Sequence, residues 1–302
     1  MKEVFIIDSI SKAHQVLGLP KPLHPLVSVV RQKDIQLDQI QEGMKIRIDL
    51  FQIWQKEGMD CEMGYGRSSY DFREGTLAFI KAGQVLTAGN KEMNPSSEGW
   101  LLLFHPDLIR KSDLGENIHT YGFFDYETNE ALHVSDGEKK SLSELIEKIE
   151  LELKQPIDRH SQNLILTNIE LLLGYCLRYY DRQFYSRTNL NQDLVSRFEK
   201  ILREYFDSEM PGEKGLPTVK YLGEKMNMSS RYLSDLLRKE SGRNAQEYIH
   251  HILIERAKNS LLGTKEAVSQ IAYQLGFEYP QHFTKLFKSK TGMSPLEFRN
   301  LN

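Results

Sequence analysis

Apolar residues in the first 130 positions fall in short runs, some of which alternate with polar residues. Four runs stand out, at 27–30 (VSVV), 45–54 (KIRIDLFQIW), 76–80 (TLAFI) and 100–104 (WLLLF). Glycine, asparagine, proline and aspartate cluster between these runs, as is typical of turns between strands. Several short strands at this spacing predict an antiparallel barrel or sandwich.

The pattern changes at Ser141, where apolar residues begin to recur at helical spacing. A first helix is predicted from there to Pro156, which ends it. Its apolar face would consist of Leu142, Leu145, Ile146, Ile149 and Leu153. A second, more apolar helix is predicted over 159–184. The two helices can cap the sheet, and we expect the second to contribute to a dimer interface. The polar residues 186–189 are the expected joint to the rest of the chain.

Residues 218–241 have the pattern of a helix-turn-helix, which needs a short apolar helix, a sharp turn and a second helix with a polar outer face. Asn227 stands where the first helix must end, and asparagine tolerates the left-handed conformation of such a turn. Ser229 is the expected N-cap of the second helix. The inner faces would carry Val219, Leu222 and Met226, then Leu233, Leu236 and Leu237. The outward residues of the second helix would be Ser230, Arg231, Ser234, Asp235 and Arg238.

The same pattern recurs about fifty residues later, over 267–292. Gly276 supplies the turn, and Ala272 is small enough for two helices to cross closely. Ile271, Ala272 and Leu275 form the expected inner face of the first helix, while Phe283, Leu286 and Phe287 anchor the second. Pro280, Gln281, His282, Thr284 and Lys285 would lie outward or near its start.

Residues 244–262 connect the two units and contain neither glycine nor proline. A helix of this length spans roughly 28 Å at about 1.5 Å per residue. Successive major grooves of DNA are about 34 Å apart. The spacing therefore predicts two recognition helices held near successive major grooves of one duplex.

Charge is distributed unevenly along the chain, whose formal net charge is −3. Residues 218–302 hold 13 basic and 8 acidic residues, whereas residues 1–217 hold 26 basic and 34 acidic ones. A basic segment beside an acidic remainder suits a DNA-binding domain joined to a domain that does not bind DNA.

Several other classes of protein are disfavoured by what the sequence lacks. The two cysteines, Cys61 and Cys176, form no CxxC pair, which disfavours a disulfide framework or a cysteine-based zinc site. Neither a signal peptide nor an apolar run of about 20 residues is found, so we expect a cytoplasmic protein without membrane association. A Walker loop, a GxSxG elbow and paired catalytic carboxylates are also missing, and we expect neither an enzyme nor a cofactor.

The C-terminal motifs resemble those of the arabinose-operon-regulator family of transcription factors, the AraC/XylS class. The segment GFEYPQHFTKLFKSKTGMSPLEFR (276–299) matches the second-unit signature of that family. The first unit, with S..YLS.LL.K..G, and the connector, with ERAK..LL, match as well, so the resemblance covers roughly 190–302. Gly223 stands where the family usually has alanine, which costs up to ~1 kcal/mol of helix propensity. Leu253 stands where arginine is common.

The resemblance places the base-facing residues by position. They would be Arg231, Ser234 and Asp235 in the first unit, and Gln281, His282, Thr284 and Lys285 in the second. Arginine can bridge guanine, glutamine can bridge adenine, and aspartate can accept from cytosine. Lysine and hydroxyl groups can equally hold phosphates. Asp235 can also simply pair with Arg231 or Arg238.

In the front domain, residues 70–85 look like the cupin-type sensory domain common in this family, although Ala82 stands where proline is frequent. The nine histidines are scattered, so we expect no metal site. His24, His105 and His119 can line a small-molecule pocket, but a role as scaffold histidines is favoured. Trp54 and Trp100 can stack on a sugar ring, but a core role is favoured.

The sequence therefore predicts an α+β protein with three parts. These are a cupin-like β-barrel sensory domain at 1–140, a helical dimerisation segment and linker at 141–189, and an all-α DNA-binding domain at 190–302. The expected function is a dimeric transcription regulator of double-stranded DNA. The resemblance implies an activator, contact with RNA polymerase, and control by an unidentified small-molecule effector. The alternatives are a cupin-type enzyme with an autoregulatory DNA-binding tail, and a dimeric scaffold whose tail binds protein.

Overall fold

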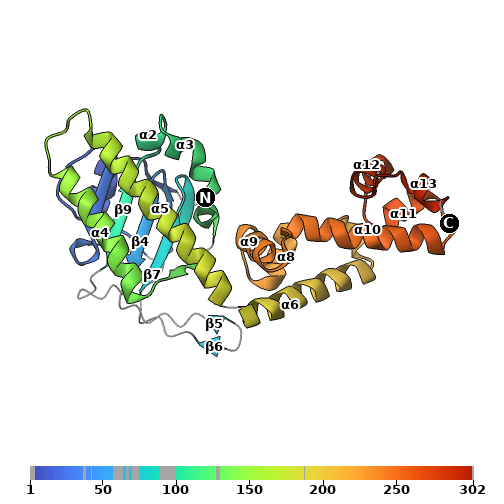
Figure 1. Cartoon of the computed structure of the whole chain (residues 1–302). Helices are drawn as coiled ribbons and strands as arrows, with labels where there is room; N and C mark the ends of the chain where they lie inside the picture. Colours follow the sequence, from blue (N-terminus) through green and yellow to red (C-terminus); the bar gives the residue numbers. More distant parts are fainter. Residues whose placement is uncertain are drawn as a thin grey trace. The chain divides into compact units, whose positions relative to one another are not determined.

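The computed structural model describes residues 4–36, 39–41, 43–56, 64–65, 68–69, 75–88, 99–126, 130–186 and 188–300. The chain divides into two compact units, Met1–Tyr185 and Ser186–Asn302. The first contains the described strands and the second is helical, which confirms a mixed fold with an all-α C-terminal part (Figure 1). Among the described residues, no helix combines the length and apolar character that a membrane span requires.

The first unit is built on two sheets. The smaller has the order β1-β3-β8, with β1 (Phe5–Ile7) parallel and β8 (Gln84–Thr87) antiparallel to β3 (Lys45–Ile48). The larger is antiparallel, with the order β10-β7-β4-β9-β2. Its strands are β2 (Val27–Arg31), β4 (Phe51–Lys56), β7 (Thr76–Ile80), β9 (Trp100–Phe104) and β10 (Leu132–His133). A short hairpin joins β5 (Gly64–Tyr65) to β6 (Ser68–Ser69).

The predicted run 45–54 is not one strand, because the chain changes sheet within it. It leaves β3 at Asp49, whose side chain accepts two hydrogen bonds from Arg47 at 3.0 Å, and enters β4 after the fully buried Leu50. Each sheet therefore keeps its own edges in the described residues, and the expected closed cupin-like barrel is not confirmed. A barrel would require the edge strands to pair with each other.

A core of aliphatic residues fills the space between the smaller sheet, the larger sheet and α1 (Ile10–Val16). Its members include Ile10, Ile46, Ile48, Leu101 and Leu103. Trp54 packs against this core, and Trp100 is only 1% exposed, so both tryptophans serve the core as favoured. His24 and His105 each accept a backbone N–H at 3.1 Å, which suits scaffold histidines.

The two predicted helices α4 (Asp136–Leu153) and α5 (Ser161–Ser186) cross one face of the larger sheet (Figure 1). Helix α4 begins five residues before the predicted start, because Ser135 and Glu138 form a reciprocal capping box that the periodicity did not reveal. Its predicted apolar face is buried except for Leu153. Tyr180 of α5 packs against Phe123 and Phe79, with ring centroids 5.4 and 6.0 Å apart. Short helical segments complete the unit at η1 (Gln32–Asp34), α2 (Pro106–Ile109), α3 (Asp113–Asn117), η3 (Ile118–Thr120) and η4 (Gly122–Asp125).

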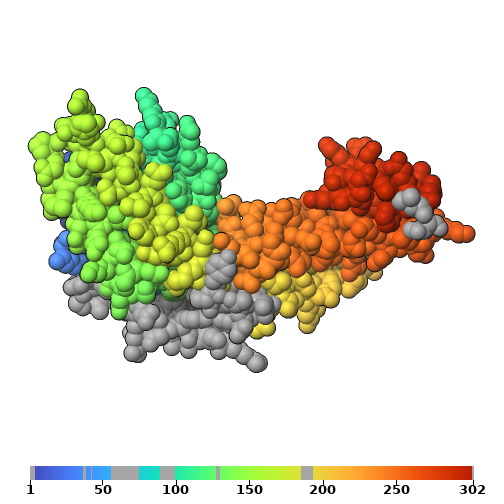
Figure 2. All heavy atoms as spheres, viewed as in Figure 1, coloured from blue at the N-terminus to red at the C-terminus, as the bar shows by residue number. Residues whose placement is uncertain are grey.

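The second unit consists of helices. In chain order they are α6 (Thr188–Asp207), α7 (Met210–Lys214), α8 (Val219–Met226), α9 (Ser230–Ser241), α10 (Ala245–Gly263), α11 (Val268–Gln274), α12 (Pro280–Thr291) and α13 (Pro295–Arg299). Helix α10 is the long helix of the unit, with α8 and α9 near its beginning and α11 to α13 near its end (Figure 1). In Figure 2 the red residues that follow α10 gather at one end of this unit.

Candidate nucleic-acid interface

The first helix-turn-helix is formed by α8 and α9, as the sequence predicts. Asn227 ends α8 in the left-handed conformation, with φ 55°, and is the one described residue other than glycine with positive φ. The amide of Met228 then donates to the carbonyl oxygen of Gly223 at 2.9 Å, which closes the turn. Ser229 caps α9 by accepting the amide of Tyr232 at 3.1 Å. The turn and cap therefore fix the direction in which α9 leaves α8.

The second helix-turn-helix, formed by α11 and α12, repeats this geometry. Gly276 carries the positive φ, here 94°, and the amide of Phe277 donates to the carbonyl oxygen of Ala272 at 3.0 Å. Ala272 therefore occupies the position that Gly223 occupies in the first unit. Both residues are buried, as expected for small residues where two helices cross closely.

Apolar side chains hold α9 and α12 against the rest of the unit. Leu233, Leu236 and Leu237 are at most 1% exposed, and Tyr232 joins them at 2%. In α12, Phe283 and Phe287 are fully buried, whereas Leu286 is only half-buried. Burial of one face of each helix leaves the opposite face free of core packing.

The residues predicted to meet DNA lie on these remaining faces. Arg231, Gln281, His282 and Lys285 are exposed, while Ser234, Asp235 and Thr284 are half-buried. Arg231, Asp235 and Thr284 have partners in the free protein. The Arg231 Nε donates to Asp235 Oδ2 at 3.1 Å, and the Thr284 hydroxyl donates to the carbonyl oxygen of Pro280 at 3.1 Å. The ring of Tyr279, an exposed residue that the sequence reading did not single out, lies 5.5 Å from that of His282.

The outer face of α12 is basic. Gln281, Lys285 and Lys288 are spaced four and three residues apart and therefore share that face. Residues 280–291 contain no acidic residue. Lysines on one helical face supply the sequence-independent attraction to phosphates on which DNA binding depends. Lys288 was not among the predicted site residues, although the same spacing rule would have found it.

Helix α10 connects the two helix-turn-helix units. Its 19 residues agree with the predicted connector to within one residue at each end. A capping box between Asn244 and Glu247 starts the helix. Helix α6 runs beside it and is tied to it at two points. The Tyr248 hydroxyl donates to the Glu199 carboxylate, and Arg256 contacts Asp207 at 2.6 Å. These two contacts therefore hold α6 and α10 side by side.

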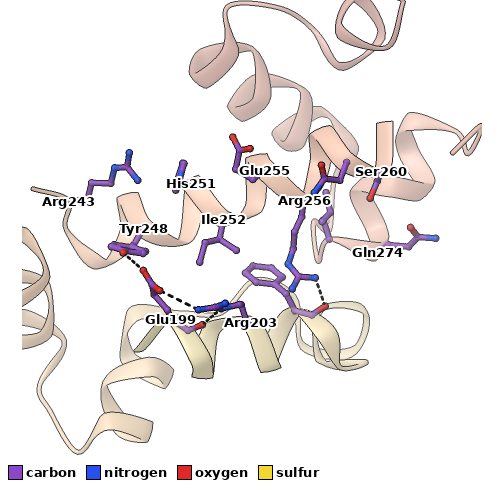
Figure 3. Close-up of a pocket in the computed structure, with 13 residues that line it drawn as sticks. Glu199, Arg203, Arg243, Tyr248, His251, Ile252, Glu255, Arg256, Ser260 and Gln274 are labelled. Atoms are coloured by element: carbon purple, nitrogen blue, oxygen red, sulfur yellow. Dashed lines mark hydrogen bonds and ion pairs between the residues drawn. The ribbon is translucent and has the colours of Figure 1, made fainter. Parts of the chain in front are cut away.

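An open cleft of about 740 Å³ lies between α6 and α10, lined by residues that include Phe206 of α6 and Ile252 of α10. Figure 3 shows Tyr248 pointing from α10 toward Glu199 and Arg203 of α6. Burial, together with the neighbouring Glu199 carboxylate, raises the pKa of Tyr248 to about 12. The phenol is therefore a neutral donor at physiological pH, as the contact with a carboxylate requires.

Residues 222–301 match the family model described as a helix-turn-helix domain. Residues 222–301 therefore form an AraC-type helix-turn-helix domain. The chain is 27% identical over 192 residues to the uncharacterized HTH-type transcriptional regulator YijO of Escherichia coli, a match that covers 64% of each chain. It is 34% identical over 83 residues to the uncharacterized HTH-type transcriptional regulator YobQ of Bacillus subtilis, a match that covers 28% of this chain and 34% of that one. The matches therefore span less than two thirds of either relative.

Among solved structures, the C-terminal domain of the two-component response regulator yesN from Fusobacterium nucleatum is 30% identical. The match covers 35% of this chain and 98% of that one, with a TM-score of 0.32.

Two residues of this AraC-type domain depart from the family pattern, and the structure gives each a local role. Leu253 is fully buried in α10, where an arginine would need a partner for its charge. A Cβ on Gly223 would lie 2.6 Å from the carbonyl oxygen of Met228. Glycine therefore avoids a steric clash in this turn, a benefit that offsets its lower helix propensity.

Proposed function

We propose that this protein is a sequence-specific DNA-binding transcription regulator that docks α9 and α12 in successive major grooves. The observation that carries the proposal is the placement of two polar-faced second helices near the two ends of one helix, α10 (Figure 1). At about 1.5 Å per residue, its 19 residues span roughly 28 Å, close to the groove repeat of about 34 Å. A modest bend of the duplex would accommodate the difference.

In this proposal Arg231, Ser234 and Asp235 of α9 face the bases of one groove. Gln281, His282, Thr284 and Lys285 of α12 face those of the next. Lys288 extends the basic face of α12 and is assigned to a phosphate. The exposure of Arg231 and Gln281 supports base contact, since both side chains can form the paired hydrogen bonds that distinguish purines.

The first unit is proposed to control this activity as a sensory and dimerisation domain. The second long helix, α5, keeps Leu164 and Leu171 about half exposed, at 46% and 48%, which supports pairing with a second copy. A small-molecule effector would act by favouring one arrangement of the DNA-binding units over another. By the family resemblance the protein would be a cytoplasmic activator that contacts RNA polymerase.

The test is selection of binding sites from random duplexes by the full chain, followed by affinity measurements against salt concentration. We expect a two-part site with half-sites about one helical turn apart, and a steep fall of affinity as salt rises. A tail that binds protein would enrich no duplex. A cupin-type enzyme would contain bound metal after purification, which elemental analysis detects.

A further inference from the structure

The second helices of the two helix-turn-helix units differ in charge. Residues 280–291 carry three lysines and no acid, whereas α9 carries Asp235 and Glu240 among its basic residues. An acidic side chain on a face that meets DNA lies close to phosphates and repels them. The sequence of α9 therefore includes a group that opposes the function proposed for its surface.

Asp235 has a defined partner on that face. Its Oδ2 accepts the Nε–H of Arg231 at 3.1 Å, and the two residues are one helical turn apart. Their side chains are 23% and 43% exposed, so solvent reaches both of them. The buried face of α9 is made by Tyr232, Leu233, Leu236 and Leu237, which places the pair on the outer face.

We propose that Asp235 is a specificity-determining residue that acts by holding Arg231. In the free protein the Asp235 carboxylate offsets the charge of this guanidinium and occupies its Nε–H, which weakens its attraction to any phosphate that comes within reach. A cognate site releases Arg231 because guanine offers it two acceptors in place of one carboxylate oxygen. The inference rests on the proposed DNA-binding function.

The pair penalises non-cognate DNA more than the cognate site. Non-specific binding is almost entirely electrostatic, so it loses the whole contribution of a held arginine. Cognate binding is weakened less, because Arg231 exchanges the Asp235 carboxylate for the two acceptors of guanine. An element that weakens the wrong complex is a common route to specificity. The lysines of α12 would then supply attraction for any sequence, while α9 discriminates between sequences.

The experiment compares the full chain with its Asp235→Asn variant on the selected duplex and on a scrambled duplex. We expect affinity for the scrambled duplex to rise about eightfold at 0.1 M salt, the effect of one added phosphate contact. The salt slope on that duplex should steepen by about 0.9. Affinity for the selected duplex should change less than threefold, so the ratio between the two affinities falls.

Three controls identify the cause. In an Arg231→Ala background, Asp235→Asn should change the ratio less than twofold, because the guanidinium of Arg231 is absent. Asp235→Glu should largely retain the discrimination between the two duplexes, since a carboxylate remains at this position. Glu240→Gln removes one negative charge from the same helix and should leave the ratio nearly unchanged.

Two results would overturn the inference. An equal rise on both duplexes, independent of Arg231, would mean that only overall charge matters. A loss confined to the selected duplex would mean that Asp235 itself bonds to a base. If the unaltered chain binds no duplex at all, the proposed function fails before this inference is reached.

Discussion

Gly276 lies against the backbone of Gly215, so closely that a Cβ on Gly276 would stand 2.8 Å from the carbonyl carbon of Gly215. The carbonyl oxygen of Gly215 also accepts the hydroxyl of Tyr205 at 2.8 Å. The turn of the second helix-turn-helix is thereby fastened to the end of α7 and, through Tyr205, to α6. Two glycines distant in sequence thus help to fix the position of α12.

Gly276→Ala should destabilise the C-terminal unit by more than about 1 kcal/mol, since alanine disfavours positive φ and its methyl group would press on backbone. Urea unfolding followed by circular dichroism measures the change. Gly263→Ala is the matched control, because a Cβ at that position on α10 meets no atom within 4 Å. Equal stability of the two variants would show that the contact at Gly215 relaxes freely.

Gly223→Ala should also lower stability, although alanine gains up to about 1 kcal/mol of helix propensity. The added methyl group would meet the carbonyl oxygen of Met228, a backbone atom held by the turn that leads into α9. The displaced turn should weaken DNA binding as well. Thermal unfolding and binding to the selected duplex test both effects, and a higher melting temperature would contradict this account.

Tyr248→Phe should change how stability depends on alkaline pH. The pKa of Tyr248 is raised from 10.0 to about 12, so the folded state holds a proton that the unfolded chain releases earlier. Its contribution is complete below pH 10 and is lost as pH rises toward 12. The variant should therefore be less stable at pH 8 and lose stability less steeply between pH 10 and 12. Other tyrosines titrate equally in both proteins, so parallel curves would count against the prediction.

Arg231→Ala and Gln281→Ala should each relax sequence preference at one base pair, by about 1–3 kcal/mol of discrimination. Site selection repeated with each variant locates the position, and far-ultraviolet circular dichroism checks the fold. Unchanged preference for both variants would refute their assignment to bases.

Lys288→Ala should weaken binding to selected and scrambled duplexes alike, and should reduce the magnitude of the salt slope by about 0.9. Lys200→Ala on α6 removes the same charge away from α12 and serves as the control. If the two substitutions have equal effects, Lys288 makes no individual phosphate contact.

The helical half of the molecule could be predicted closely because its signals are local. Asn227, Gly276 and the Ser229 cap each act within one turn of the chain, and the 3.6-residue period marks the buried faces. The residues of α9 and α12 that do not belong to the buried faces then form the exposed faces. For this reason the candidate site residues could be named from sequence, whereas their pairing, as between Arg231 and Asp235, depends on side-chain geometry.

The sequence by itself determined the strand runs, the two long helices of the first unit and the tandem helix-turn-helix pattern. The tertiary structure decided what depends on distant partners. It divided the run 45–54 between two sheets, because strand pairing joins residues far apart in sequence. It tied α6 to α10 through Tyr248 and Glu199, and it gave Gly223 a steric reason that helix propensity cannot express. Local chemistry sets the elements, but packing between them sets the site.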